Sequence, residues 1–415
     1  MQGWFRQTTG GLPKTFWYLW TGTLINRMGS FVIVFLALYL TSARHFSASY
    51  AGLVVGLYGA GGAIGTLTGG VLADRWGRRR TLLLSYLGGP VCMLSLGLLR
   101  DRWGIMIGAI CLGTAAEMAR PAFAALMVDV VPVKDRLRAF TLNYWAINLG
   151  FACASVLAGL VAQASYLLLF VGDAATTVLT ALIVLTRVRD VPRVPASTAA
   201  TPGRPDSLRT GFADRVFVVF VGLNLLTAFT FMQHISGLPI AMAHDGLSPA
   251  TFGAVIALNG VLIVLGQLFV PRLVGGRDRS RVLTLAALIL GLGFGLTAFA
   301  HVALFYAVTV LIWTLGEMLN SPSNATLLAE LSPAHLRGRY QGVFSLSWQS
   351  AACLAPILGG LVQQHLGSKW LWLGCGVVGG LVALGHALSG PSRARRIAQA
   401  TAPPPVPVIR EPAAS

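Results

Sequence analysis

The chain is a succession of long apolar stretches, and this feature limits its possible folds more than any other. A helix needs about 20 mostly apolar residues to cross a bilayer, and twelve such stretches occur. Inside lipid the backbone polar groups must be paired within the segment, so these runs predict helices and an all-α polytopic membrane protein. The twelve predicted spans are 16–40, 48–72, 81–99, 104–128, 138–162, 165–186, 215–240, 250–274, 282–300, 302–328, 339–363 and 370–389.

The composition excludes a water-soluble globular protein. Hydrophobic residues make up 55% of the chain and charged residues 11%, whereas a soluble domain is about one quarter charged. Disorder is excluded on the same ground. The cysteines all lie in apolar runs without C-x-x-C spacing, which indicates neither a disulfide framework nor a metal site. These cysteines are Cys92, Cys111, Cys153, Cys353 and Cys375.

The basic residues predict the orientation of the chain in the membrane. The formal net charge is +17, which in a polar protein would suggest a nucleic-acid partner. Here only Arg44, Arg100, Arg102 and Lys369 fall in loops on one side, while most other Lys and Arg residues fall on the opposite side. Cytoplasmic loops are enriched in Lys and Arg, so we expect both termini in the cytoplasm and no nucleic-acid partner. The excess of Arg over Lys is typical of a GC-rich bacterium, which predicts a bacterial cytoplasmic (inner) membrane.

A polar interruption divides the spans six and six. Residues 187–214 are rich in Pro, Ser, Thr, Gly and charge, which predicts a cytoplasmic linker. It separates an N-terminal six-helix bundle at 1–186 from a C-terminal six-helix bundle at 215–390. Residues 391–415 are rich in proline near their end, and we expect a disordered cytoplasmic tail there.

The two halves are also related in sequence. A shift of 201 residues aligns 121–163 with 322–364 without a gap, and the same shift aligns 52–84 with 253–285. Because each half contributes six spans, both copies enter the membrane from the same side. This predicts two pseudo-symmetric bundles, as in secondary transporters with a site between the bundles near mid-membrane.

The loop between the second and third spans carries a specific motif. It reads Gly69-Gly70-Val71-Leu72-Ala73-Asp74-Arg75-Trp76-Gly77-Arg78-Arg79-Arg80. This run resembles the signature G-x-L-A-D-R-x-G-R-(R/K)-(R/K) of the major facilitator superfamily. With the six-plus-six repeat, the resemblance extends over nearly the whole chain and is greatest to the twelve-helix drug:proton antiporter branch.

The resemblance implies that this loop forms a cytoplasmic gate. A small residue at Gly70 would allow two helices to approach closely, and Gly77 would permit a tight turn. Asp74 would face the positive N-terminal end of the span that begins around Gly338–Gly342. This contact would close the cytoplasmic side.

Ion pairs are expected beside this gate. Arg78 would pair with Asp129, and the repeat maps this pair onto Arg279 and Glu330. We interpret these charges as gate structure and not as a substrate site. The predicted gate residues are Gly70, Asp74, Arg75, Gly77, Arg78, Asp129, Arg279 and Glu330.

Charges inside the predicted spans mark the working part of the protein, because ionisable residues in a membrane are costly. We expect Glu117 and Glu317 to bind protons or substrate, since a carboxyl group that faces each side in turn can carry a proton. Arg27 and Arg120 are expected as their charge partners, or as a structural ion pair that locks the first and fourth helices. Asp173, on a helix expected to be peripheral, favours a packing or capping role over a coupling role.

Further polar and aromatic side chains lie within the spans. They could contribute to the substrate or proton pathway, or join helices through hydrogen bonds. These candidates are Asn26, Trp145, Asn148, Gln233, His234, Asn259, Trp313, Asn320, Trp348 and Gln349.

The first functional hypothesis is proton-coupled efflux of small amphipathic compounds or drugs by alternating access. The alternative within transport is a proton-coupled symporter for a sugar, peptide or other metabolite. A scaffold or receptor is a further class, and an enzyme has little support because P-loop, H-E-x-x-H and G-x-S-x-G motifs are absent. We expect no cofactor and no metal, a proton gradient as driving force, and a monomer that contacts membrane lipids and a small-molecule substrate.

Overall fold

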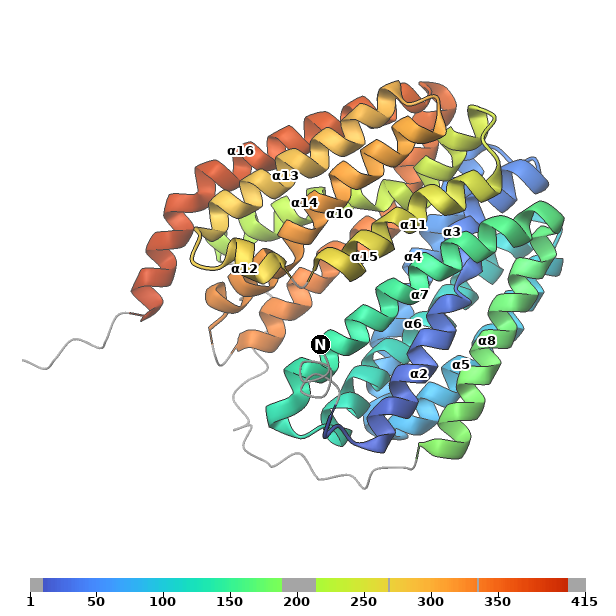
Figure 1. Cartoon of the computed structure of the whole chain (residues 1–415), viewed down its shortest axis with the longest axis horizontal. Coiled ribbons are helices and arrows are strands. Elements are labelled where there is room, and N and C mark those ends of the chain that lie inside the picture. The colour runs from blue at the N-terminus through green and yellow to red at the C-terminus, as the bar shows by residue number, and fades with distance from the viewer. Residues whose placement is uncertain (1–9, 189–213, 268, 334–335, 402–415) are drawn as a thin grey trace, which may run out of the picture.

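The computed structural model describes residues 10–188, 214–267, 269–333 and 336–401, and these form two bundles of helices (Figure 1). Most of the predicted linker and residues 402–415 of the predicted tail lie outside the described residues. The first bundle contains α2 (Lys14–Met28), α3 (Phe31–Leu38), η1 (Tyr39–Ala43), α4 (Ala48–Arg75), α5 (Arg78–Leu98), α6 (Arg102–Val130), η2 (Val133–Asp135), α7 (Arg136–Ala164) and α8 (Tyr166–Arg187). The second contains α10 (Arg215–His244), α11 (Pro249–Gly266), α12 (Val270–Val274), α13 (Arg279–Leu296), η3 (Thr297–Phe299), α14 (Ala303–Leu331), α15 (Arg337–His365) and α16 (Ser368–Thr401).

The helices repeat with the same shift that relates the two halves of the sequence. α4 begins at Ala48 and α11 at Pro249, while α6 begins at Arg102 and α14 at Ala303, so each pair is 201 residues apart. The same shift relates the beginnings of α2 and α10, α5 and α13, and α7 and α15. The prediction of two pseudo-symmetric six-helix bundles is therefore confirmed.

Eleven of the described helical segments are long and apolar enough to cross a membrane. α6 is the twelfth span by its length of 29 residues and by its packing against α4 and α5. Glu117 and Arg120 lie in its second half and lower its mean hydropathy. The described part of the chain contains helices and no strands, which confirms the predicted all-α class.

The first predicted span, 16–40, lies within the segment Lys14–Ala43, which is long and apolar enough to cross a membrane, but this segment is not one continuous helix. α2 ends at Met28, and α3 begins at Phe31 after a break at Gly29 and Ser30. A Cβ atom on Gly29 would overlap the side chain of Thr176 on α8. The break therefore lies where α8 comes too close for any larger residue.

Two other predicted boundaries need correction. The span expected over 250–274 is interrupted, because α11 ends at Gly266 and the short α12 begins at Val270. The last helix, α16, continues to Thr401, so residues 391–401 are helical and do not belong to a disordered tail. Arg393 fixes this extension by donating hydrogen bonds to His386, about two helix turns earlier.

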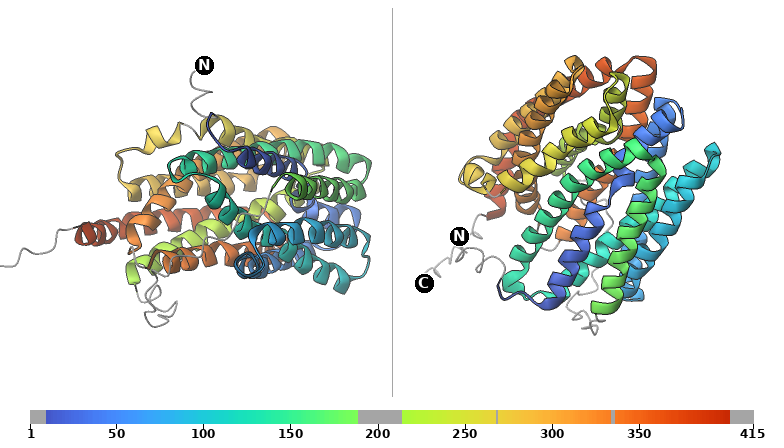
Figure 2. Two further views of the ribbon diagram at one scale, coloured as in Figure 1. Left: turned by 90° about the horizontal axis from the view of Figure 1, so that it is seen from below. Right: turned by 45° about the vertical axis from the view of Figure 1, so that its right-hand side comes forward.

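The two bundles touch through equivalent small residues. We call the side on which Val188 and Asp214 lie the linker side. A Cβ atom on Gly52 of α4 would overlap the carbonyl oxygen of Pro356 on α15, and one on Gly253 of α11 would overlap that of Ser155 on α7. These contacts lie in the half of the molecule away from the linker side, and the ribbons of the two bundles diverge towards the linker side (Figures 1 and 2).

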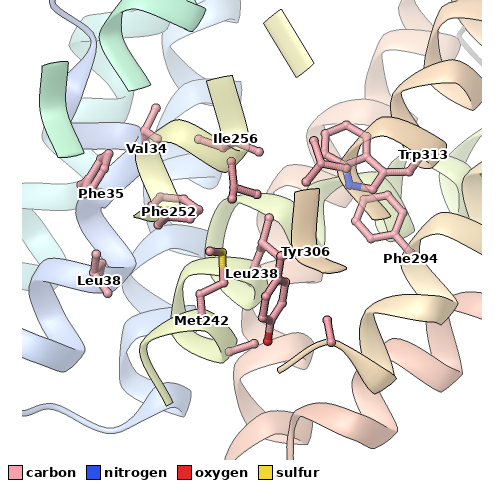
Figure 3. Packing of buried hydrophobic residues seen from close by; sticks show 14 of the residues in the cluster. Val34, Phe35, Leu38, Leu238, Met242, Phe252, Ile256, Phe294, Tyr306 and Trp313 are labelled. Carbon is pink, nitrogen blue, oxygen red and sulfur yellow. The ribbon is translucent and has the colours of Figure 1, made fainter. Parts of the chain in front are cut away.

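An apolar cluster seals the bundles together on the side away from the linker. Figure 3 shows Phe35 and Leu38 of α3 facing Phe252 of α11 and Met242 of α10. The rings of Phe35 and Phe252 meet edge to face, with their centroids 5.2 Å apart. Packing contacts of this kind hold helices together inside a membrane.

Candidate functional site

The first bundle encloses a polar cavity of about 90 Å³. Arg27 of α2, Glu117 of α6 and Asp173 of α8 line it, together with the hydroxyl-bearing Tyr58 and Tyr86. A cavity of this size that is lined by polar groups can hold water. The structure therefore places Arg27, Glu117 and Asp173 around one cavity.

The charge partners within this region differ from the expected ones. Arg120 Nε lies 2.9 Å from Glu117 Oε2, one helix turn away on α6. This ion pair joins two residues of one helix, so Arg120 does not lock α2 to α6. The side chain of Arg120 is largely exposed, whereas that of Glu117 is mostly buried. Among the described residues, Arg27 forms no ion pair within 4.0 Å with a carboxylate.

The break between α2 and α3 is held by polar side chains of α8. Asn26 donates a hydrogen bond to Thr177 Oγ1 at 3.0 Å. The backbone N–H of Val32, in the first turn of α3, donates to Asp173 Oδ2 at 3.1 Å. A carboxylate at this place satisfies a backbone donor that the helix leaves unpaired. The expected capping role of Asp173 is therefore present, although at a helix start that the sequence did not reveal.

Glu317 belongs to a separate site in the second bundle. Asn259 of α11 donates hydrogen bonds to Glu317 Oε2 at 2.7 Å and to Thr314 Oγ1 at 3.2 Å. Glu317 is not among the residues that line the cavity of the first bundle. The two carboxylates therefore lie on the repeat-related helices α6 and α14 but in different polar surroundings. They are not equivalent positions, because the shift of 201 residues aligns Glu117 with Met318 and not with Glu317.

Of three further predicted pathway residues, two join helices and one bonds within its own helix. Gln233 is fully buried and donates to the carbonyl of Ala355 at 2.9 Å, which links α10 to α15. Asn148 donates to the carbonyl of Tyr144 within its own helix. Gln349 of α15 donates to Thr66 of α4 at 3.3 Å and thereby crosses between the bundles.

The aromatic candidates fall into two groups. Trp313 is fully buried and stacks on Phe294 with ring centroids 5.3 Å apart. His234 lies against Trp313 and lines a small apolar cavity at the bundle contact. Trp348 is only partly buried, and Trp145 is exposed. These two rings are therefore more accessible than Trp313.

A buried chain of amides was missed in the sequence. Asn324 of α14 donates to Asn320 at 3.0 Å and to Asn224 of α10 at 3.3 Å, and Asn224 donates to Ser347 of α15 at 2.7 Å. Of these only Asn320 was a candidate. Asn224 and Asn324 lie within apolar spans, so their polarity was a signal that could have revealed the chain.

Ion pairs flank the motif loop in both bundles. Arg78 pairs with Asp129, and Arg279 Nε lies 4.0 Å from Glu330 Oε1 at the repeat-related place. Gly77 has a φ of +101°, a backbone conformation that favours glycine. Asp74 and Arg75 are exposed, and the approach of Asp74 to the start of α15 stays a prediction.

The close helix approach expected at Gly70 was wrong. A Cβ atom on Gly70 would meet nothing within 4 Å, whereas one on the preceding Gly69 would overlap the backbone of Met118 on α6. The two glycines point about 100° apart around the helix. The motif is therefore present, but Gly69, and not Gly70, makes the close contact between α4 and α6.

Alanine substitutions should separate the two glycines. We expect Gly69→Ala to destabilise the protein by about 1–3 kcal/mol because the added methyl group overpacks the α4–α6 contact. Gly70→Ala, the matched control, should be neutral or stabilise the helix by up to about 1 kcal/mol. Thermal unfolding in detergent measures both. Equal losses for the two variants would contradict the assignment of the contact to Gly69.

Comparison with known proteins agrees with this architecture. The profile of the Major Facilitator Superfamily matches residues 19–356 and 225–412. The chain is 26% identical to an uncharacterized MFS-type transporter, YqjV of Bacillus subtilis, over 85% of this chain and 87% of that protein. It is 24% identical to the multidrug resistance protein MdtH of Aeromonas hydrophila, over 88% and 92%.

A solved structure supports the fold. The crystal structure of the nucleoside transporter NupG superimposes with a TM-score of 0.77 at 15% identity, covering 91% of this chain and 100% of that one. The matched family and the named relatives are transporters and not enzymes. With its two six-helix bundles and its motif loop, the chain belongs to the major facilitator superfamily.

Proposed function

We propose that the protein is a proton-coupled exporter of small amphipathic compounds that works by alternating access in a bacterial cytoplasmic membrane. The observation that carries the proposal is the environment of Glu317. Its carboxylate accepts a hydrogen bond from the neutral amide of Asn259, and no Lys or Arg of the described residues forms an ion pair with it. A carboxyl group without a fixed cation inside a membrane is suited to bind and release a proton.

Two further observations support export. The relative MdtH is named a multidrug resistance protein. The basic residues favour the linker side as the cytoplasmic side, and the bundles meet on the side away from it (Figure 1). In this arrangement a substrate would enter between the bundles from the cytoplasm. A rocking movement would then open the opposite side.

A second candidate is symport of a polar metabolite. The amide chain of Asn224, Asn320 and Asn324 favours it, because hydrogen-bonding side chains between helices suit a polar substrate better than an apolar one. The direction of substrate movement relative to the proton gradient separates the two candidates.

The test uses purified protein in proteoliposomes with ethidium as the probe for amphipathic aromatic cations. For an antiporter, we expect an acidic lumen to drive ethidium into the vesicles, and a protonophore to abolish the uptake. Movement of ethidium that ignores the imposed gradient would overturn the proposal. Uptake of a sugar or dipeptide from an acidic medium, with no ethidium transport, would favour symport.

A further inference from the structure

The second part of the first span, α3, connects the two bundles. α2 packs against α6, α7 and α8 of its own bundle, whereas α3 also packs against α10 of the other bundle. Val34, Phe35 and Leu38 of α3 belong to the apolar cluster on the side away from the linker (Figure 3). This contact must separate if that side is to open, so the position of α3 is part of the conformational change.

α8 fixes the chain on both sides of the break. Thr180 donates to the carbonyl of Gly22 at 3.1 Å, and Thr177 accepts from Asn26. Beyond the break, Asp173 accepts the N–H of Val32. Of these contacts, only that of Asp173 involves a group that can change its charge. Asp173 is 4% exposed, and α3 itself contains no titratable side chain.

The cavity gives Asp173 a route for proton exchange. Asp173 lines it together with Arg27 of α2, Tyr58 of α4, Tyr86 of α5 and Glu117 of α6. These are the titratable groups that face the cavity, with Arg120 behind Glu117. A space of this polarity and size can hold water, and water can pass a proton between the two carboxylates.

We propose that Asp173 is a second proton-binding site and that its ionised form holds α3 against α10. A hydrogen bond to an ionised acceptor is stronger than one to a neutral acceptor, and a negative charge is favourable at the start of a helix. When α3 leaves, Asp173 loses its backbone donor and takes a proton from water in the cavity, which leaves a neutral carboxyl group. When α3 returns, the N–H of Val32 favours the carboxylate and the proton returns to water.

This inference rests on the proposed function, because it supplies one step of proton-driven transport. It also differs from a purely structural cap. A structural cap requires an acceptor oxygen on residue 173 and nothing more, whereas a proton site requires that the group titrate. Asparagine keeps the acceptor oxygen and the shape but cannot ionise.

The experiment measures the separation of the bundles as a function of pH. Spin labels would be attached at Ser42, after α3, and at His244, at the end of α10, in full-length protein in which the native cysteines are replaced. We expect the wild type to shift towards longer label distances as the buffer changes from mildly alkaline to mildly acidic. Asp173→Asn should lose this pH-dependent shift completely.

Thr180→Val is the matched control, because it removes another hydrogen bond between α8 and the first span without touching a titratable group. It should keep the pH-dependent shift. The same shift in Asp173→Asn as in the wild type would overturn the proposal, as would a pH-independent distance in the wild type. Glu317→Gln should keep the shift while losing gradient-driven transport, which separates a failure of this inference from a failure of the proposed function.

A second variant covers the case in which Asp173→Asn does not fold. Val32→Pro removes the backbone donor in the first turn of α3, where proline costs the helix no intrahelical hydrogen bond, and leaves the carboxyl group intact. We expect the pH-dependent distance change to shrink or disappear, because the charge of Asp173 no longer acts on α3 through this hydrogen bond. A pH-dependent change as large as that of the wild type would contradict the coupling between Asp173 and α3.

Discussion

Replacing Glu317 with glutamine should abolish gradient-driven transport. Glutamine keeps the size of the side chain and an oxygen that accepts the hydrogen bond of Asn259, but it cannot release a proton. We therefore expect proton-driven uptake of ethidium in proteoliposomes to fall to the level of protein-free vesicles. Exchange of labelled for unlabelled ethidium at equal pH should persist, because that reaction needs no net proton movement.

Asp245→Asn is the matched control for this substitution. Asp245 lies at the end of α10 and accepts a hydrogen bond from Tyr306 at 2.7 Å, outside both polar sites. It should keep gradient-driven uptake. Wild-type pH dependence in Glu317→Gln would show that the proton is carried elsewhere, and Glu117 would then be the next carboxylate to replace.

Valine at Gly52 or Gly253 should prevent the bundles from closing on the side away from the linker. The added side chain would overlap backbone atoms of Pro356 or Ser155, and backbone cannot rotate away as a flexible side chain can. Overpacking of this kind costs about 1–3 kcal/mol and occasionally more. We expect both variants to lose transport and to melt at a lower temperature.

Gly88→Val and Gly374→Val are the controls, because a Cβ atom at either position meets nothing within 4 Å. They should retain transport and melt near the wild-type temperature. The two interface glycines are related by the repeat, so their losses should be similar. A loss at Gly52 without one at Gly253 would contradict a symmetric bundle contact.

The helix pattern was predictable because it depends on local composition. An apolar run long enough to cross the membrane must pair its own backbone groups, so it forms a helix. The shift of 201 residues that relates the two halves of the sequence also separates the beginnings of α4 and α11. The break in the first span at Gly29 and Ser30 could not be predicted from the local sequence. It is held by a hydrogen bond from Val32 to Asp173, and these two residues are 141 positions apart in the chain.

The candidate site was only partly predictable for a related reason. Charge inside a span marked Glu117 and Glu317, since such residues are costly there. Their partners depend on packing, and Asn259 is 58 residues from Glu317. Similarly, the motif marked Gly70, but the rotation of α4 against α6 decides that Gly69 makes the contact.

The most direct test of the central claim follows the proton while the substrate moves. Proteoliposomes that contain a pH-sensitive dye would start with equal pH on both sides, and ethidium would be added to the medium. Exchange of ethidium for protons predicts that the lumen becomes more alkaline as ethidium enters, in the wild type and in Asp245→Asn but not in Glu317→Gln. An unchanged or more acidic lumen during ethidium entry into wild-type vesicles would contradict proton-coupled export.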